Sequence, residues 1–426
     1  MHVAAETLLY TLLFCALYAQ VFLLVTFLEM RAVRARGTLC RSAARPSIAG
    51  KSSPIDLNPR VAIIVPCWNE ERTLMGTLDS LLALEYPRDK LSIVIVDDGS
   101  TDGTNAAAER YRAHPQVALL SKENGGKYTA LNLGIEHIGV SADLIGCLDA
   151  DSFVAPSALR EIVRVFTDPS IMAVTSLIKV VKPHTIMERV QSVEYITSGF
   201  LREVLGSINA LFVTPGPFSI YRRDVFEKLG PYRAAHQTED LEIAMRMHAH
   251  GMQIGNTLSA LVYTRAPRTF RQLFRQRVRW HYGFLRNALD YRAMFLRPQF
   301  GHVALFGIPA AVASIIGSII FFGYSIYDIA RSLAHRALQW ATVGLRFEFP
   351  PDFSWFFVPT APKVLLSLVL VATFLIIVWQ SRRAAEGRRG FPRYFLYFFA
   401  LYGMIAPLWY ARAIYNVIRA RGGTWR

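Results

Sequence analysis

The stretch that decides the fold is Leu91-Ser92-Ile93-Val94-Ile95-Val96-Asp97-Asp98-Gly99, a β-branched apolar run that ends in two acids and a glycine. A similar run, Val61-Ala62-Ile63-Ile64-Val65, precedes it and ends at Pro66, and residues 70–84 between the two have a helical pattern. Strand-helix-strand units of this kind form parallel sheets, and their ligands bind at the carboxyl ends of the strands. The sequence therefore predicts an α/β domain with a crevice at that edge.

Acidic side chains follow three of the predicted strands. Pro66-Cys67-Trp68-Asn69-Glu70 follows the first strand, Asp97-Asp98 follows the second, and Leu144–Leu148 runs into Asp149-Ala150-Asp151. An Asp-x-Asp at a strand end could be an Asx-turn that caps the next helix. Carboxylates that converge on one crevice repel each other, however, and a bound cation offsets that repulsion. Paired carboxylates also hold Mg²⁺ or Mn²⁺ against substrate phosphates, so we expect one of these ions as a cofactor.

Three further polar motifs follow in order along the chain: Asn124-Gly125-Gly126-Lys127, Thr238-Glu239-Asp240 and Gln276-Arg277-Val278-Arg279-Trp280. Each has a purely structural alternative: a tight turn, an acidic helix N-terminus that the helix dipole favours, and an amphipathic interfacial helix. Their functional interpretation is a phosphate-binding lysine, a general base and an acceptor platform. The five motifs together indicate an enzyme.

Four apolar runs indicate a membrane protein. They cover approximately residues 7–28, 302–327, 362–380 and 394–416, and the chain is 52% hydrophobic with a mean hydropathy of +0.26. Arginines just after the first run place its end inside the cell, so the N-terminus is predicted outside and the catalytic domain cytosolic. Residues 328–361 are predicted to be an external loop. The last run contains Pro407 and Arg412, which leaves a bent or re-entrant segment open.

The net charge of +15 is explained by arginines beside the spans and in residues 265–297, and no nucleic-acid-binding module accompanies it. We therefore expect contact with membrane lipid and no nucleic acid. The predicted organisation is given by five ranges: an N-terminal transmembrane helix at 1–30, a basic linker at 31–59, a catalytic domain at 60–264, amphipathic interfacial helices at 265–298, and a region of about three spans at 299–426.

Residues 60–296 resemble the inverting family-two glycosyltransferases of GT-A fold, especially the membrane-embedded synthases of poly-N-acetylglucosamine, hyaluronan, chitin and cellulose. The resemblance implies a Rossmann-like cytosolic domain that binds a UDP-sugar, joined to α-helical transmembrane segments. It is carried by the five motifs above, including the Gln-x-x-Arg-Trp pattern of Gln276, Arg279 and Trp280.

The resemblance also implies a role for each motif. Asp240 would be the catalytic base, and Asp149 and Asp151 would hold the metal. The donor would contact Pro66, Asn69, Glu70, Asp97, Asp98, Lys127, Asp149 and Arg279. The acceptor would contact Glu239, Gln276 and Trp280. Residues 214–221 resemble the glycine-containing segment that lines the acceptor pocket.

Three functions remain open at this point: a processive polysaccharide synthase, an enzyme that moves one sugar to a lipid such as ceramide, and an inactive membrane scaffold. Single displacement at the anomeric carbon requires a base on one side and positive charge on the other, and the motifs provide both. We expect the first function, in the plasma membrane of a bacterium or archaeon. The sugar, the linkage, and any homo-oligomer or accessory membrane protein are left open.

Overall fold

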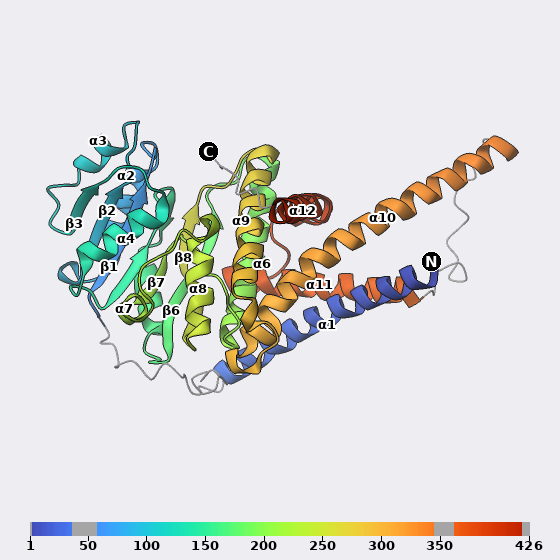
Figure 1. The fold of residues 1–426 in the computed structure, drawn as a ribbon, viewed down its shortest axis with the longest axis horizontal. Coiled ribbons are helices and arrows are strands. Elements are labelled where there is room, and N and C mark those ends of the chain that lie inside the picture. Colours follow the sequence, from blue (N-terminus) through green and yellow to red (C-terminus); the bar gives the residue numbers. More distant parts are fainter. Residues whose placement is uncertain (1, 36–57, 345–361, 420–426) are drawn as a thin grey trace.

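The computed structural model describes residues 2–35, 58–344 and 362–419. A mixed sheet with helices on both faces forms one end of the molecule, and long helices extend from it to the other end (Figure 1). The predicted linker beyond Ala35 and the predicted external loop beyond Gly344 lie mostly outside the described residues.

The sheet has eight strands in the order β3-β2-β1-β4-β7-β6-β8-β5. Their bounds are β1 (Val61–Cys67), β2 (Leu91–Asp97), β3 (Val117–Ser121), β4 (Leu144–Cys147), β5 (Ser152–Val154), β6 (Ile171–Val180), β7 (Ser219–Arg222) and β8 (Gln253–Thr264). Strand β1 pairs in parallel with β2 and with β4, and β2 pairs in parallel with β3. Strands β4 and β6 are antiparallel to β7, and β5 is antiparallel to β8.

This topology brings the predicted polar motifs together. The chain adds β2 and β3 on one side of β1 and then crosses to add β4 on the other side. In a doubly wound sheet such a reversal opens a crevice at the carboxyl ends of the strands. The carboxyl ends of β1, β2 and β4 lie at the same edge because all three strands are parallel. The predicted strands and their shared edge are therefore confirmed.

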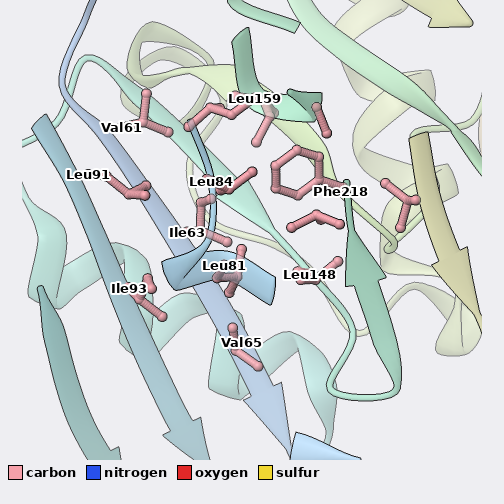
Figure 2. Close-up of a cluster of buried hydrophobic side chains, with 14 of the residues drawn as sticks. Val61, Ile63, Val65, Leu81, Leu84, Leu91, Ile93, Leu148, Leu159 and Phe218 are labelled. Carbon is pink, nitrogen blue, oxygen red and sulfur yellow. The ribbon is translucent and has the colours of Figure 1, made fainter. Parts of the chain in front are cut away.

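Side chains along β1 alternate between the two buried faces of the sheet, which explains why the sequence of this strand is an unbroken apolar run. Val61, Ile63 and Val65 point to one face and pack with Leu81 and Leu91, as Figure 2 shows. Ala62 and Ile64 point to the other face and pack in a second cluster with residues of α4 and α8. A sheet covered on both faces needs apolar residues at every position, because successive side chains alternate between the faces.

Helices cover the sheet and connect it to the spans. Those of the sheet domain are α2 (Leu74–Leu82), α3 (Thr104–Glu109), α4 (Lys127–Ile138), α5 (Ala158–Val165), α6 (Ile186–Ser207), α7 (Arg223–Leu229), α8 (Glu239–Ala249) and α9 (Phe270–Asp290). The remaining long helices are α1 (His2–Ala35), α10 (Ile308–Val343), α11 (Pro362–Glu386) and α12 (Phe395–Ile418). Short 3₁₀ or π turns are η1 (Arg88–Lys90), η2 (Ala235–Gln237), η3 (Arg292–Met294), η4 (Pro298–Phe300) and η5 (Val303–Gly307).

Three of the described helices are long and apolar enough to cross a membrane: Glu6–Val33, Val303–Thr342 and Pro362–Glu386. They belong to α1, α10 and α11, which extend away from the sheet in Figure 1. The prediction of a loop from residue 328 is wrong as far as Val343, because α10 continues unbroken to that residue. Its polar residues, such as Arg331 and Arg336, are exposed on the helix surface.

The fourth apolar run behaves differently from the other three. It forms the continuous helix α12 with Pro407 inside it, and it is not among the described helices that qualify as spans. In Figure 1, α12 is seen end-on while α1 and α11 lie in the plane of the picture, so α12 crosses their direction. It packs against α6, α9 and α10. The expected third C-terminal span is therefore a transverse helix beside the catalytic domain.

Candidate active site

The loop after β2 organises one side of the crevice. Asp98 is 3% exposed. One of its carboxylate oxygens accepts hydrogen bonds from Lys122 Nζ at 2.7 Å and from the Gly125 amide at 3.0 Å. The other oxygen accepts one from the Gly126 amide at 2.8 Å. Asp98 thus holds the Gly125-Gly126 turn in place, and this turn presents Lys127 at the start of α4.

Asp97 and Asn69, two other predicted donor contacts, are also held by hydrogen bonds in the loop after β2. Asp97 accepts hydrogen bonds from the Ser100 amide and the Asn105 side chain. Asn69, which has a positive φ of 58°, accepts one from the Thr101 amide at 2.8 Å. The loops after β1 and β2 therefore form one hydrogen-bonded wall. Asp97, Asp98 and Asn69 shape this wall, and their contact with a nucleotide stays a prediction.

A cavity of about 410 Å³ opens beside that wall. It is lined by Asn69, Glu70, Glu71, Arg72, Thr73, Asp102, Asp151 and Arg265. Pro66 lies in β1 just before the wall. Burial raises the pKa of Glu70, against a hydrogen bond of 2.5 Å that its carboxylate accepts from Thr73. Arg265 was not predicted as a site residue. A basic residue directly after the end of β8 was the signal that could have revealed it.

Lys127 lies at the centre of the acidic side of the crevice. Its ammonium group is 2.5 Å from Asp149 Oδ1 and 3.5 Å from Glu239 Oε1. Burial disfavours the ammonium charge, but the two carboxylates outweigh burial and raise the pKa of Lys127 well above its usual value. The side chain is therefore a fixed positive charge, as a phosphate-binding lysine must be. The structure thus joins three predicted motifs at one ion-pair cluster.

A glycine allows the loop after α6 to pass directly over this cluster. A Cβ at Gly216 would lie 2.5 Å from Lys127 Nζ and 2.8 Å from Asp149 Oδ1. Real Cβ atoms do not approach other atoms so closely. Gly216 belongs to the 214–221 segment that the resemblance assigns to the acceptor pocket, and that assignment stays a prediction.

Asp151 faces the cavity without a cationic partner. Its carboxylate accepts hydrogen bonds from the Ser152 and Thr264 hydroxyls, and no ion pair to it occurs within the described parts of the chain. Burial, and then the charge of Asp149, raise the pKa of Asp151 to about 6. A divalent cation would relieve both effects, so the residues fit the predicted metal. No group of three or more potential His, Cys, Asp or Glu ligands occurs among the described residues, and Mg²⁺ sites complete their coordination with substrate phosphates and water.

Asp240, the predicted base, lies in the first turn of α8. Its backbone carbonyl accepts hydrogen bonds from Thr214, which fixes its position beside the 214–217 loop. Its carboxylate has no hydrogen bond to any described residue. Burial, and then the charge of Glu239, raise the pKa of Asp240 to about 7, against the opposing effects of Lys127 and Arg279.

The turn before Asp240 has an unusual backbone that the sequence did not reveal. Ala235, His236 and Gln237 all have positive φ values, of 43°, 54° and 64°. Non-glycine residues in this region carry strain of roughly 1–3 kcal/mol each, and such strain concentrates at functional sites. Arg279 donates a hydrogen bond of 3.1 Å to the Gln237 carbonyl and thereby braces the turn.

Helix α9 packs closely against the same turn. A Cβ at Gly283 would lie 2.3 Å from Thr238 Oγ1, and the Asn287 side chain donates a hydrogen bond of 2.9 Å to that oxygen. Only glycine permits this approach of the helix to the Thr238-Glu239-Asp240 motif. This packing positions Arg279 of the motif close enough to Asp240 for its charge to lower the pKa of that carboxylate, against burial.

Behind the motif lies a buried cluster that the sequence analysis missed. Arg277 is 1% exposed and pairs with Glu194 of α6 at 2.7 Å. Its guanidinium lies 4.2 Å from the ring centroid of Trp280, and it donates a hydrogen bond to Gln276 Oε1. Glu194 also accepts a hydrogen bond from Tyr402 of α12. The two predicted acceptor residues of α9 are thus held by one arginine, which is linked to both α6 and α12.

The geometry defines a class of protein: an α/β domain with a free carboxylate, an acid-bound lysine and an aspartate without a cationic partner at one crevice, joined to apolar helices long enough to cross a membrane. Residues 59–283 match the family described as "Glycosyltransferase like family 2". The chain belongs to this family of glycosyltransferases.

Similar proteins agree with the family assignment. The chain is 30% identical over 226 residues to a poly-beta-1,6-N-acetyl-D-glucosamine synthase of Staphylococcus aureus (strain COL), which covers 52% of this chain and 54% of the relative. A protein with the same name from Staphylococcus epidermidis is 29% identical over the same length. The match spans about half the length of these curated relatives.

One solved structure shares the fold over nearly the whole chain. It is a mannosyltransferase from Pyrobaculum calidifontis in complex with GDP-Man and Mn²⁺. The TM-score is 0.59 with 19% sequence identity, and the alignment covers 97% of this chain and 99% of that chain. At this identity the likeness shows the fold alone. The predicted GT-A fold is confirmed, and with its three apolar helices the chain is an integral membrane protein.

Proposed function

We propose that this protein transfers a hexose or N-acetylhexosamine from a UDP-sugar to a growing polysaccharide, with inversion at the anomeric carbon, on the cytosolic side of the membrane. The single observation that carries the proposal is the Asp240 carboxylate, which is half-buried and makes no hydrogen bond to the described residues. Three neighbouring acids have cationic partners: Asp149 and Glu239 bind Lys127, and Asp98 binds Lys122. A carboxylate kept free in this way is suited to accept a proton.

In the proposed mechanism, the acceptor hydroxyl gives its proton to Asp240 while its oxygen attacks the anomeric carbon. The bond from that carbon to the UDP oxygen breaks, and one displacement inverts the centre. Lys127 and Arg279 stabilise the negative charge that develops on the departing diphosphate. Asp151 and Asp149 would hold Mg²⁺ or Mn²⁺, which when bound supplies further positive charge for the diphosphate.

The acceptor and the donor sugar are proposed from the relatives. The curated relatives are named as synthases of a β-1,6-linked N-acetylglucosamine polymer, which supports UDP-N-acetylglucosamine as the first donor to test. Trp280 offers an apolar ring face suited to a sugar of the acceptor. The Arg277 guanidinium carbon lies over the Trp280 ring, 4.2 Å from the ring centroid. We place Gln276 and Glu239 with Trp280 on the acceptor side.

The test supplies radiolabelled UDP-N-acetylglucosamine or UDP-glucose to the purified full chain with Mg²⁺ or Mn²⁺, and the products are sized. We expect a long polymer from the wild type, none from Asp240→Asn, and wild-type behaviour from the exposed control Asp89→Asn. A single-sugar lipid as the sole product would contradict the polymer proposal. Intact donor under every condition would contradict transferase activity itself.

A further inference from the structure

A second cavity, separate from the crevice, lies where two predicted spans meet the catalytic domain. Its volume is about 640 Å³, within the range of roughly 300–1,000 Å³ that is usual for ligand sites. One wall comes from the end of α1 (Phe27, Met30 and Arg31) and another from the end of α11 (Arg383, Ala384 and Gly387). None of its lining residues lines the crevice cavity.

The third wall is built by an irregularity in the sheet. Strand β6 advances from Thr175 to Leu177 while its partner β8 advances from Asn256 to Leu261. The extra residues of β8 leave the ladder, and the cavity is lined there by Asn256, Thr257, Leu258 and Ser259. Bulges of this kind re-aim side chains and recur next to functional sites. The amide and hydroxyl groups of this wall can donate hydrogen bonds.

The two arginines give the cavity its charge. Arg31 lies 5.7 Å from the ring centroid of Phe27, and Arg383 lies 5.6 Å from that of Trp379. Neither guanidinium has a hydrogen bond or an ion pair with any of the residues that the structure describes. The one lining acid is Glu203, which is 4% exposed and accepts a hydrogen bond of 2.8 Å from the Asn256 amide. Arg31 and Arg383 thus line the cavity without an acidic partner, while the Glu203 carboxylate is already bound to Asn256.

The apolar residues of the cavity wall are packed into the helix bundle. Phe27 and Met30 are buried and pack with Phe200 of α6 and Ile377 of α11. One cavity thus combines apolar residues of the two spans, two arginines and the hydroxyls of the β8 bulge. This combination matches the chemistry of a phospholipid, with an acyl chain beside the spans and an anionic phosphate at the guanidinium groups.

We propose that this cavity binds the headgroup of an anionic phospholipid from the leaflet next to the catalytic domain. Bound there, the lipid phosphate joins the end of α1, the end of α11 and the β8 bulge. The negative charge of the lipid phosphate then holds the two spans, α1 and α11, against the β8 bulge of the catalytic domain. A free phosphate would match the arginines but would leave the apolar walls unused.

The experiment measures lipid binding to the detergent-purified full chain by native mass spectrometry, with phosphatidylglycerol, phosphatidylcholine and inorganic phosphate as probes. An arginine near an anionic lipid contributes about fivefold in affinity. Arg31→Gln/Arg383→Gln should therefore weaken phosphatidylglycerol binding about 25-fold. The matched control Arg388→Gln/Arg389→Gln removes two exposed arginines of the same segment that do not line the cavity, and it should bind like the wild type.

A second variant fills the cavity and keeps both charges. Ser259 is exposed in the bulge, so Ser259→Phe should fold and should also weaken phosphatidylglycerol binding. Equal losses in the matched control would assign the effect to the general surface charge and overturn the proposal. Equal binding of phosphatidylcholine, displacement of the lipid by millimolar inorganic phosphate, or unchanged binding in Ser259→Phe would overturn it as well.

Discussion

Replacing Arg277 should show whether this residue stabilises the packing of α6, α9 and α12, positions the acceptor, or does both. In Arg277→Met, the Glu194 carboxylate loses its 2.7 Å partner but stays largely buried at 17% exposure. Removing one partner of a buried ion pair costs about 3–5 kcal/mol. We expect Arg277→Met to show a clear loss of thermal stability. The exposed Arg275→Met on the same helix is the control and should melt like the wild type.

The double variant Glu194→Gln/Arg277→Met separates the loss of stability from the loss of sugar transfer. Neutralising Glu194 removes the uncompensated charge, and the Gln oxygen can still accept the hydrogen bond from Tyr402. Most of the lost stability should therefore return. The guanidinium over the Trp280 ring does not return, and a buried cation–π contact contributes about 2 kcal/mol, or about 30-fold. Sugar transfer should stay about 30-fold below the wild type in the double variant.

Two assays on the same samples distinguish the roles. Radiolabel incorporated into product reports transfer, and UDP release without acceptor reports donor hydrolysis. We expect transfer to fall while donor hydrolysis holds, because Arg277 contacts Gln276 and Trp280, which we propose to lie on the acceptor side. Transfer at the wild-type rate in a stable double variant would show that Arg277 is structural only. A parallel loss of donor hydrolysis would show that the cluster serves the donor.

Three further predictions concern the crevice. Asp240→Asn should abolish transfer and leave UDP binding nearly unchanged. In the wild type, the rate of transfer should rise as the pH increases through about 7. Burial raises the pKa of Asp240 to about 7, and only the ionised carboxylate accepts a proton. Asp151→Ala should weaken UDP binding, measured by titration calorimetry, only when Mg²⁺ or Mn²⁺ is present, and full wild-type activity in EDTA would contradict the metal role. Gly216→Ala should raise the KM for the UDP-sugar at least about fivefold, because its Cβ would displace Lys127 and overpacking costs about 1–3 kcal/mol. Gly323→Ala, whose Cβ would meet no atom within 4 Å, should have no effect.

The central strands and the acidic edge could be predicted because burial on both faces leaves a signal in the sequence. Val61–Val65 and Leu91–Val96 are unbroken apolar runs, and each ends where the polar motifs begin. The antiparallel part of the sheet was less visible. Strand β7 has four residues, and its pairing with β4 and β6 depends on contacts distant in the sequence.

Two of the missed residues, Glu194 and Lys122, share one property: each acts through a partner far along the chain. Glu194 pairs with Arg277, and Lys122 with Asp98. No local spacing encodes these pairs. Helix α6 did carry a local signal that could have been used, the Thr185–Glu188 capping box at its start. The three-residue left-handed turn at 235–237 had none, since it contains no glycine.

Helix α9 provides the physical link between the crevice and the helices of the membrane side. One face touches the Thr238 loop through Gly283 and Asn287. The other face touches α12, where the His281 ring lies 4.6 Å from that of Tyr410. Both contacts are close-packed, and packed interiors transmit displacements instead of absorbing them. A shift of α12, which crosses the direction of α1 and α11 (Figure 1), would therefore displace α9, which carries Trp280. The proposed acceptor platform and the proposed base Asp240 would then lose their alignment.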